Sequence, residues 1–181
     1  MKFELCTDSV TGAVIADQFG FTSIELCSAL SVGGLTPNYG LIKQCADQTG
    51  LEVHSMIRHK EGGFQATGDD LVIMRLDIIA AKKAGAHGVV FGILDANNKI
   101  ADSNKDLVAL AHELGLKTTF HRAFDFVPDY RQAMRKVEDF GFDRLLTSGQ
   151  EPEAINGLGI IADIQGEYGD KIDIIAGSGV S

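Results

Sequence analysis

The sequence lacks several features, and each absence excludes a class of protein. Its three cysteines, Cys6, Cys27 and Cys45, are an odd and small number for 181 residues, which argues against a disulfide-stabilised secreted scaffold. No apolar run approaches the roughly 20 residues that span a bilayer, and the first residues lack the apolar core of a secretory signal. We therefore expect a cytoplasmic protein without a membrane partner.

Positive charge is also scarce. The chain carries 16 lysines and arginines against 25 acidic residues, a formal net charge of -9. Such a chain repels a phosphate backbone at long range, so nucleic acid is not an expected partner, and small molecules, metal ions or proteins remain. The hydrophobic content of 45% and the length predict one domain spanning residues 1–181.

What the sequence does contain is a repeat marked by glycines. Six glycines each end an amphipathic stretch and precede a short apolar, β-branched run. A glycine just past a helix often adopts the left-handed conformation, so each is predicted to end a helix. They lie 26 to 35 residues apart, at Gly20, Gly50, Gly85, Gly115, Gly141 and Gly169.

The six runs that follow these glycines, and a seventh before the first helix, are predicted to be strands, and the stretches between them helices. The stretch before Gly85 shows the helical period best, with Val72, Leu76 and Ile79 at i, i+4 and i+7. Acidic residues at its start and lysines near its end complement the helix dipole. The predicted strands are residues 3–6, 23–26, 52–57, 88–93, 117–121, 143–147 and 171–176.

Alternating strands and helices imply parallel strands joined by right-handed crossovers, either closed as a barrel or open as a doubly wound sheet. No dinucleotide-binding fingerprint follows the first strand, which weakens the open-sheet alternative. Eight repeats of about 30 residues would give about 240, near the ~250 of an eightfold barrel. We therefore predict an α/β fold, a TIM-type (β/α)8 barrel that is incomplete, with about seven strands, truncated before strand eight.

In such barrels the chemistry is done at the carboxyl ends of the strands and in the loops that follow. Period two places Glu4 and Cys6 on one strand face, and likewise Glu25 and Cys27. A purely structural core does not need so many polar groups at one barrel mouth. The later strands add Met56, His54, Arg58, His121, Arg122 and Asp125.

Two kinds of site are compatible with these residues, beside a plain network of ion pairs. Catalysis on a small anionic molecule would use Arg58 and Arg122 to orient it and Glu4, Glu25 or His121 to move a proton. An anion site is a related prediction, although such glycine-rich segments are common in plain turns. Its residues are Ser148, Gly149, Gly177 and Gly179.

The second kind of site is a metal site. Cys6 and Cys27 end neighbouring predicted strands, and thiolate with thioether or imidazole is a soft ligand set suited to copper(I). The alternative is that both cysteines are simply buried, as free cysteines often are. Cys45, within the second predicted helix, is expected to be core. Glycine-rich segments at 33–37 and 61–64 are candidate lids of the mouth.

Several segments, taken together and in order, resemble the CutC family. They run nearly the length of the chain: Glu25-Leu26-Cys27-Ser28-Ala29-Leu30, Gly33-Gly34-Leu35-Thr36-Pro37, Met56-Ile57-Arg58, Val89-Val90-Phe91-Gly92, Phe120-His121-Arg122-Ala123-Phe124-Asp125 and Leu146-Thr147-Ser148-Gly149.

The resemblance implies a cytosolic barrel, usually oligomeric and here expected to be a homodimer, associated with copper homeostasis and proposed to bind copper(I) through cysteine. Cys27 is the first residue to which that role is carried over, with Cys6 beside it. The chain departs from the family pattern in three places. His59-Lys60-Glu61 replaces a proline-arginine-glycine run, Gln150 replaces a common glycine, and Ser178 interrupts a glycine triplet, so the anion site is weakened.

Overall fold

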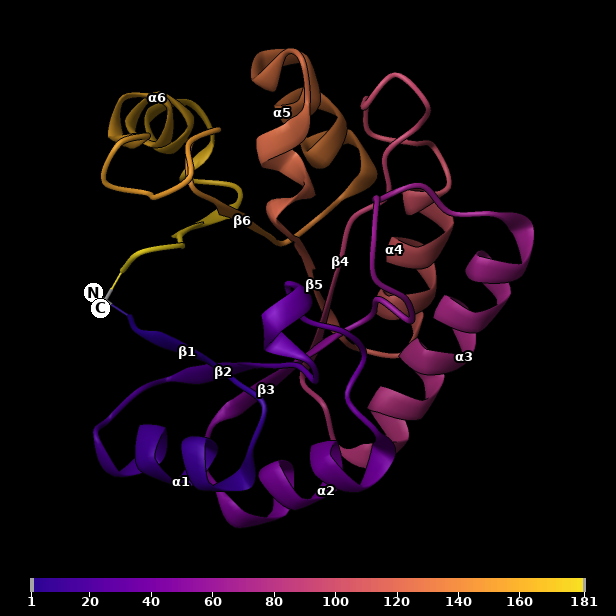
Figure 1. The fold of residues 1–181 in the computed structure, drawn as a ribbon, viewed down its shortest axis with the longest axis vertical. Helices are drawn as coiled ribbons and strands as arrows, with labels where there is room; N and C mark the ends of the chain where they lie inside the picture. The colour runs from indigo at the N-terminus through magenta and orange to yellow at the C-terminus, as the bar shows by residue number, and fades with distance from the viewer. Residues whose placement is uncertain (1, 181) are drawn as a thin grey trace. The chain divides into compact units, whose positions relative to one another are not determined.

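The computed structural model describes residues 2–180 and shows strands and helices in strict alternation (Figure 1). The strands are β1 (Glu4–Thr7), β2 (Ser23–Leu26), β3 (Glu52–Met56), β4 (Gly88–Phe91), β5 (Lys117–Phe120), β6 (Arg144–Thr147) and β7 (Asp173–Ala176). The helices are α1 (Val10–Gln18), α2 (Tyr39–Gln48), α3 (Gly68–Ala84), α4 (Asn104–Glu113), α5 (Tyr130–Phe140) and α6 (Leu158–Tyr168), with short 3₁₀ helices η1 (Leu30–Val32) and η2 (Arg122–Phe126).

The sheet has seven strands in the sequence order β1 to β7. The chain divides into two compact units. The first contains the residues up to Gly63, Thr67–Val90 and Leu110–Lys117, and the second contains Phe64–Ala66, Phe91–Ala109 and the residues from Thr118 on. The strand pairs within each unit are parallel. The parallel α/β architecture is thus confirmed, whereas a single domain stays a prediction.

The glycines predicted to end helices adopt the left-handed conformation at four of the six positions. Gly20, Gly85, Gly115 and Gly141 have φ between 67° and 102°, which is the left-handed region. Helix α6 also ends at Gly169, its C-cap residue, but φ is -62° there, so the left-handed conformation is not used. The prediction is wrong at Gly50, which is not left-handed. Helix α2 ends instead through an extended Thr49, whose hydroxyl donates to the carbonyl of Cys45 at 2.9 Å.

Helix α3 has the ends that the sequence predicts. Its N-terminal Thr67 and Asp70 form a reciprocal capping box, and lysines occupy its last turn. The apolar period at Val72 and Leu76 does not mark the buried face, because these side chains are 57% and 61% exposed. The side chains of α3 that face the interior include those of Met74 and Ile78.

One register row across the first unit positions the polar groups of interest. Cys6 lies opposite Glu25, Glu25 opposite His54, and His54 opposite Gly88. Residues in register on parallel strands point to the same face of the sheet, so these four share one face. The neighbouring positions Ile24, Leu26 and Val53 are fully buried on the other face.

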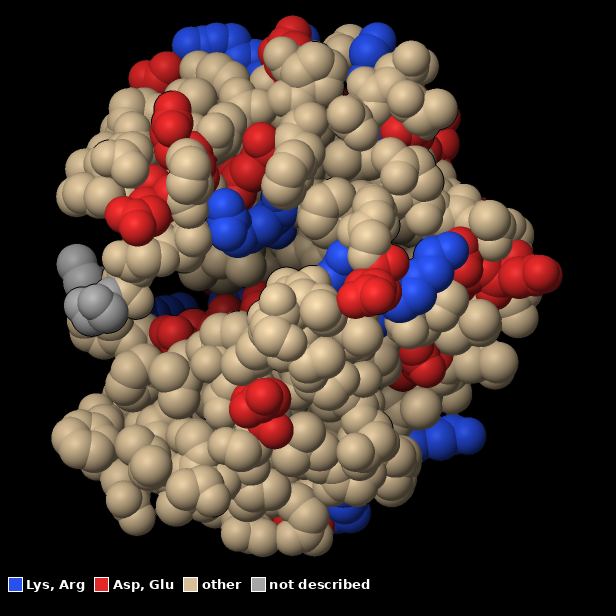
Figure 2. Space-filling model, viewed as in Figure 1, with Lys and Arg blue, Asp and Glu red and all other residues tan. Residues whose placement is uncertain are grey.

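The surface carries both signs of charge. Figure 2 shows acidic and basic side chains scattered among uncharged ones on the face it presents. No helix among residues 2–180 has the length and apolar character needed to cross a membrane.

Candidate functional site

Two thiols and one carboxylate converge at the carboxyl ends of β1 and β2. Ligand atoms of Cys6, Glu25 and Cys27 all lie within 4.8 Å of one another. The Cys6 thiol donates to Glu25 Oε1 at 3.6 Å, and the Cys27 thiol donates to the same oxygen at 3.8 Å. Parallel pairing continues past β2, where the Cys27 amide donates to the Thr7 carbonyl at 2.9 Å. We call these three residues the thiol–carboxylate cluster.

The two thiols differ in their access to solvent. Cys6 is exposed, whereas Cys27 is 1% exposed and packs with Met56 and Val90. Gly34 covers Cys27 so closely that a Cβ there would lie 3.0 Å from Sγ and 3.5 Å from Cε of Met56. A thioether therefore lies beside the buried thiol of the cluster, and a glycine backbone lies on top of both.

The surroundings of Cys27 favour its neutral form. Its pKa is raised well above the ordinary value, first by the hydrogen bond with Cys6, then by burial and by the negative charge of Glu25. Proximity of negative charge and loss of hydration both disfavour a thiolate. A bound cation reverses this balance, because it is attracted by the same charges and takes thiolate as a ligand.

Three other predicted residues of the first unit lie around this cluster but not in it. Glu4 lies two residues before Cys6 on β1, and its carboxylate accepts a hydrogen bond from the Ser23 hydroxyl at 2.7 Å. His54 Nε2 lies 3.4 Å from the carboxylate of Glu52, which is on the same strand. Arg58 follows β3, and its guanidinium donates to backbone carbonyls of the neighbouring loops.

In the second unit, Asp125 organises the polar residues that follow β5 and β6. Its carboxylate accepts from Arg122 Nε at 2.9 Å, from the amide of Ser148 at 3.1 Å and from the amide of Gln150 at 3.2 Å. The Thr147 hydroxyl donates to it as well. Arg122 also donates to the Ser148 hydroxyl at 2.9 Å. Arg122 and Ser148 are therefore held by a buried aspartate.

His121 is buried, and its tautomer follows from its neighbour. The Ala123 amide donates to Nδ1 at 3.2 Å, so in the neutral ring the proton lies on Nε2. The ring also contacts Phe64 edge-on, with centroids 5.1 Å apart. His121 and Arg122 belong to the second unit and the thiol–carboxylate cluster to the first, and their sharing one mouth stays a prediction.

Two of the glycine amides predicted for an anion site already donate within the protein. The Gly149 amide donates to the Thr147 hydroxyl at 2.9 Å, and the Gly177 amide donates to the Thr147 carbonyl at 3.0 Å. Gly179 lies against the side chain of Glu153. The anion site remains a prediction, and these contacts give it little support. Ser178 and Gln150, which replace family glycines, have φ of 81° and 63°.

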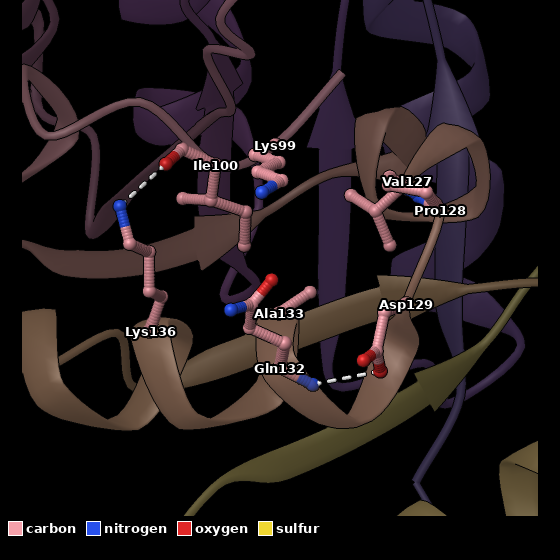
Figure 3. Close-up of a pocket in the computed structure, with 8 residues that line it drawn as sticks. All are labelled: Lys99, Ile100, Val127, Pro128, Asp129, Gln132, Ala133 and Lys136. Carbon is pink, nitrogen blue, oxygen red and sulfur yellow. Dashed lines mark hydrogen bonds between the residues drawn. The ribbon is translucent and has the colours of Figure 1, made fainter. Parts of the chain in front are cut away.

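The second unit also holds a cavity of about 240 Å³, seen in Figure 3. Its lining includes Lys99 and Lys136, beside apolar Ile100 and Val127. Lys136 donates to the Ile100 carbonyl at 2.9 Å and to Asp102 at 2.7 Å. The pKa of Asp95 is lowered, first by the Lys99 amide and also by the charges of both lysines. Because these cations already have acidic neighbours, the cavity is a weaker candidate than the cluster.

Sequence reasoning did not anticipate the contacts of two residues. It assigned Arg58 to substrate binding, which stays a prediction, and the guanidinium donates to backbone carbonyls. It gave no role to Asp125, whose carboxylate accepts from Arg122 and from the Ser148 amide. An aspartate four residues after a histidine and three after an arginine, at the end of a predicted strand, was the available signal for Asp125. The contacts of Arg58 had no such signal, because backbone acceptors cannot be read from side-chain identity.

A family profile, curated relatives and solved structures all match nearly the whole chain. The profile of the CutC family matches residues 1–181. A CutC family protein of Glaesserella parasuis serovar 5 (strain SH0165) is 41% identical over 181 residues, covering 100% of this chain and 74% of that protein. A solved structure from Streptococcus agalactiae, named as a copper homeostasis protein CutC, has 32% identity and a TM-score of 0.90, covering 98% of this chain and 88% of that one.

A more distant structure, QR15, an aldolase, has 14% identity and a TM-score of 0.68 over 99% of this chain and 80% of its own. At that identity the likeness concerns the fold alone. Together with the strand order, it confirms the predicted α/β class with parallel strands of the TIM type.

Proposed function

Since the chain belongs to the CutC family, we propose that it takes part in copper homeostasis by binding copper(I) through Cys27 and Cys6. One observation carries the proposal: two thiols and a carboxylate have ligand atoms within 4.8 Å of one another at the strand ends. Thiolate sulfur is the soft donor that copper(I) prefers. Copper is the cargo in this proposal.

The residues of the cluster have distinct parts in binding. Cys6 and Cys27 supply the sulfur ligands, and the thioether of Met56 packs beside Cys27 as a further soft donor. Glu25 accepts both thiol hydrogen bonds, so it is placed to take up one of the two protons that the thiols release when they bind a metal, while the other leaves to solvent from the exposed Cys6. Before it is protonated, its negative charge attracts the incoming cation.

A copper(I) titration against a competing chelator tests the proposal. The wild-type protein should bind one copper(I), and Cys6→Ser with Cys27→Ser should lower the affinity by more than a hundredfold. Cys45→Ala is the matched control, since Cys45 is a buried thiol in α2 outside the cluster and its loss should leave the affinity unchanged. An affinity unchanged in the double variant would remove the proposal.

A second candidate function is an enzyme acting on a small anionic metabolite, with Arg58 and Arg122 orienting it and Glu4, Glu25 or His121 moving a proton. The observation in its favour is His121, a buried imidazole whose Nδ1 is already an acceptor and whose Nε2 carries the proton. Thermal shifts with a metabolite library test it. A stabilising ligand whose effect disappears in both His121→Ala and Arg122→Ala supports the enzyme, and a library without any such ligand argues against it.

The family resemblance also leads us to propose a cytoplasmic homodimer. In support, α3 exposes Val72 and Leu76, which are 57% and 61% exposed and lie one helical turn apart. Apolar side chains grouped in this way suit contact with another protein surface. Sedimentation velocity of the purified protein decides between monomer and dimer.

A further inference from the structure

The loop between β2 and α2 covers the buried half of the thiol–carboxylate cluster. Residues 29–34, here called the lid loop, contain η1 (Leu30–Val32) and are closed at the base by two bonds between Ser28 and Leu35. The Ser28 amide donates to the Leu35 carbonyl at 2.8 Å, and the Leu35 amide donates back at 2.7 Å. The lid loop is therefore a compact loop whose two ends are held together by these two hydrogen bonds.

The inner side of the lid loop lies on Cys27. Gly34 is buried, and only a hydrogen fits between its backbone and Sγ, since a Cβ would lie 3.0 Å from that atom. Gly33 and Gly34 have φ of 87° and 85°, which glycine adopts without steric cost. The close contact accounts for the difference between the two thiols of the cluster, one exposed and one 1% exposed.

Arg58 holds the lid loop from the neighbouring strand end. Its Nη1 donates to the carbonyls of Val32 at 3.0 Å and Gly34 at 3.2 Å, and its Nη2 donates to the carbonyl of Gly62 at 2.7 Å. The fork of a guanidinium can reach several acceptors at once, and hydrogen bonds to a charged donor are stronger than neutral ones. Arg58 thus ties two loops together directly beside Cys27.

We infer that Arg58 is a positioning residue that keeps the lid loop closed over Cys27, so that a soft cation reaches Cys6 first and Cys27 only when the lid loop lifts. This inference rests on the proposed function for its cargo. The order follows from exposure, because Cys6 is open to solvent in the same structure in which Gly34 covers Cys27. Both terminal nitrogens of the Arg58 guanidinium donate to backbone carbonyls, so the role of Arg58 is to hold the lid loop.

Alkylation of the metal-free protein by iodoacetamide, with peptide mapping of each cysteine, tests the lid loop independently of copper. In the wild-type protein Cys6 should react much faster than Cys27. Arg58→Ala should raise the rate at Cys27 by at least about tenfold, because it removes two charged hydrogen bonds to the lid loop and the loss of one already corresponds to about that factor. Cys45, buried in α2, is the internal control, and its rate should stay unchanged.

Two further variants sharpen the test. Arg58→Lys keeps the charge but cannot reach the three carbonyls with one fork, so its rate at Cys27 should fall between wild type and Arg58→Ala. Arg75→Ala removes an equal charge from the exposed face of α3 and should change nothing. An unchanged rate at Cys27 in Arg58→Ala, or a parallel rise at Cys27 and Cys45, would overturn the inference. Failure of copper(I) binding would overturn the proposed function, whereas the lid loop is decided by the alkylation rates.

Discussion

Strands β3 and β4 lie so close together at Gly88 that we predict a measurable loss of stability when this glycine is replaced by alanine. This glycine lies in register with His54, in the same row as Glu25 and Cys6. A Cβ at Gly88 would lie 2.3 Å from His54 Nδ1, 2.8 Å from its Cε1 and 3.0 Å from the Lys117 carbonyl oxygen. Ordinary contact between such atoms needs about 3.5 Å, so Gly88→Ala forces the imidazole to move.

The expected cost of Gly88→Ala is about 1–3 kcal/mol of unfolding free energy, as for other overpacking substitutions. For a chain of this size that corresponds to a fall in Tm of about 2–12 °C. Differential scanning calorimetry and urea unfolding measure both quantities. Gly68→Ala is the matched control, since a Cβ at the first residue of α3 meets no atom within 4 Å and should cost nothing.

A double-mutant cycle assigns the cost to the imidazole. In a His54→Ala background, Gly88→Ala should cost at least about 0.5 kcal/mol less than in the wild type, with a remainder from the Lys117 carbonyl. If Gly88→Ala were as mild as Gly68→Ala, the row that carries Glu25 and Cys6 would not be packed as described. The geometry of the thiol–carboxylate cluster would then lose its support.

Three other predictions concern stability. Thr67→Ala removes the hydroxyl that caps α3 and should cost about 1 kcal/mol in urea unfolding. Gly166→Ala should stabilise by about 0.5–1 kcal/mol, because a Cβ in the last turn of α6 meets nothing within 4 Å. A hydrogen bond from Lys117 lowers the pKa of Glu52, so the stabilisation by this exposed pair is fully present above the ordinary pKa of a glutamate and is lost as pH falls through the lower folded value. Lys117→Met should lower the unfolding free energy by less than about 1 kcal/mol at pH 7, and this difference should shrink as the pH falls below the ordinary pKa.

Six of the seven strands could be predicted from sequence because each is a short apolar run that closely follows a glycine at or near a helix end. The clearest error in length is at β4, which was predicted to reach residue 93 and ends at Phe91. The side chain of Asn104 accepts from the Ile93 amide at 3.0 Å and donates to its carbonyl at 2.8 Å. A partner eleven residues away therefore takes the backbone groups that a longer strand would have used, and no local pattern shows it.

The cluster itself could be anticipated, since period two and parallel pairing together bring Cys6, Glu25 and Cys27 to one edge. The part played by Arg58 could not. Two of its acceptors are backbone carbonyls of a loop that has left-handed residues at Ala29, Gly33 and Gly34 and whose ends, Ser28 and Leu35, pair with each other. Side-chain identity suggested an anion partner for a guanidinium that binds the protein's own main chain.

The offset between the two cysteines favours an ion over a disulfide. Cys6 is opposite Glu25, so Cys27 is its diagonal neighbour, two residues further along the next strand. With strands about 4.8 Å apart and a rise of about 3.3 Å per residue, the two Cα atoms are about 8 Å apart. A disulfide needs Cα atoms closer than about 7 Å, whereas two sulfurs that each lie about 2.3 Å from a shared ion need no such approach. Two such sulfurs lie at most about 4.6 Å apart, and the ligand atoms of the cluster all lie within 4.8 Å of one another, so the second geometry needs only small side-chain movements.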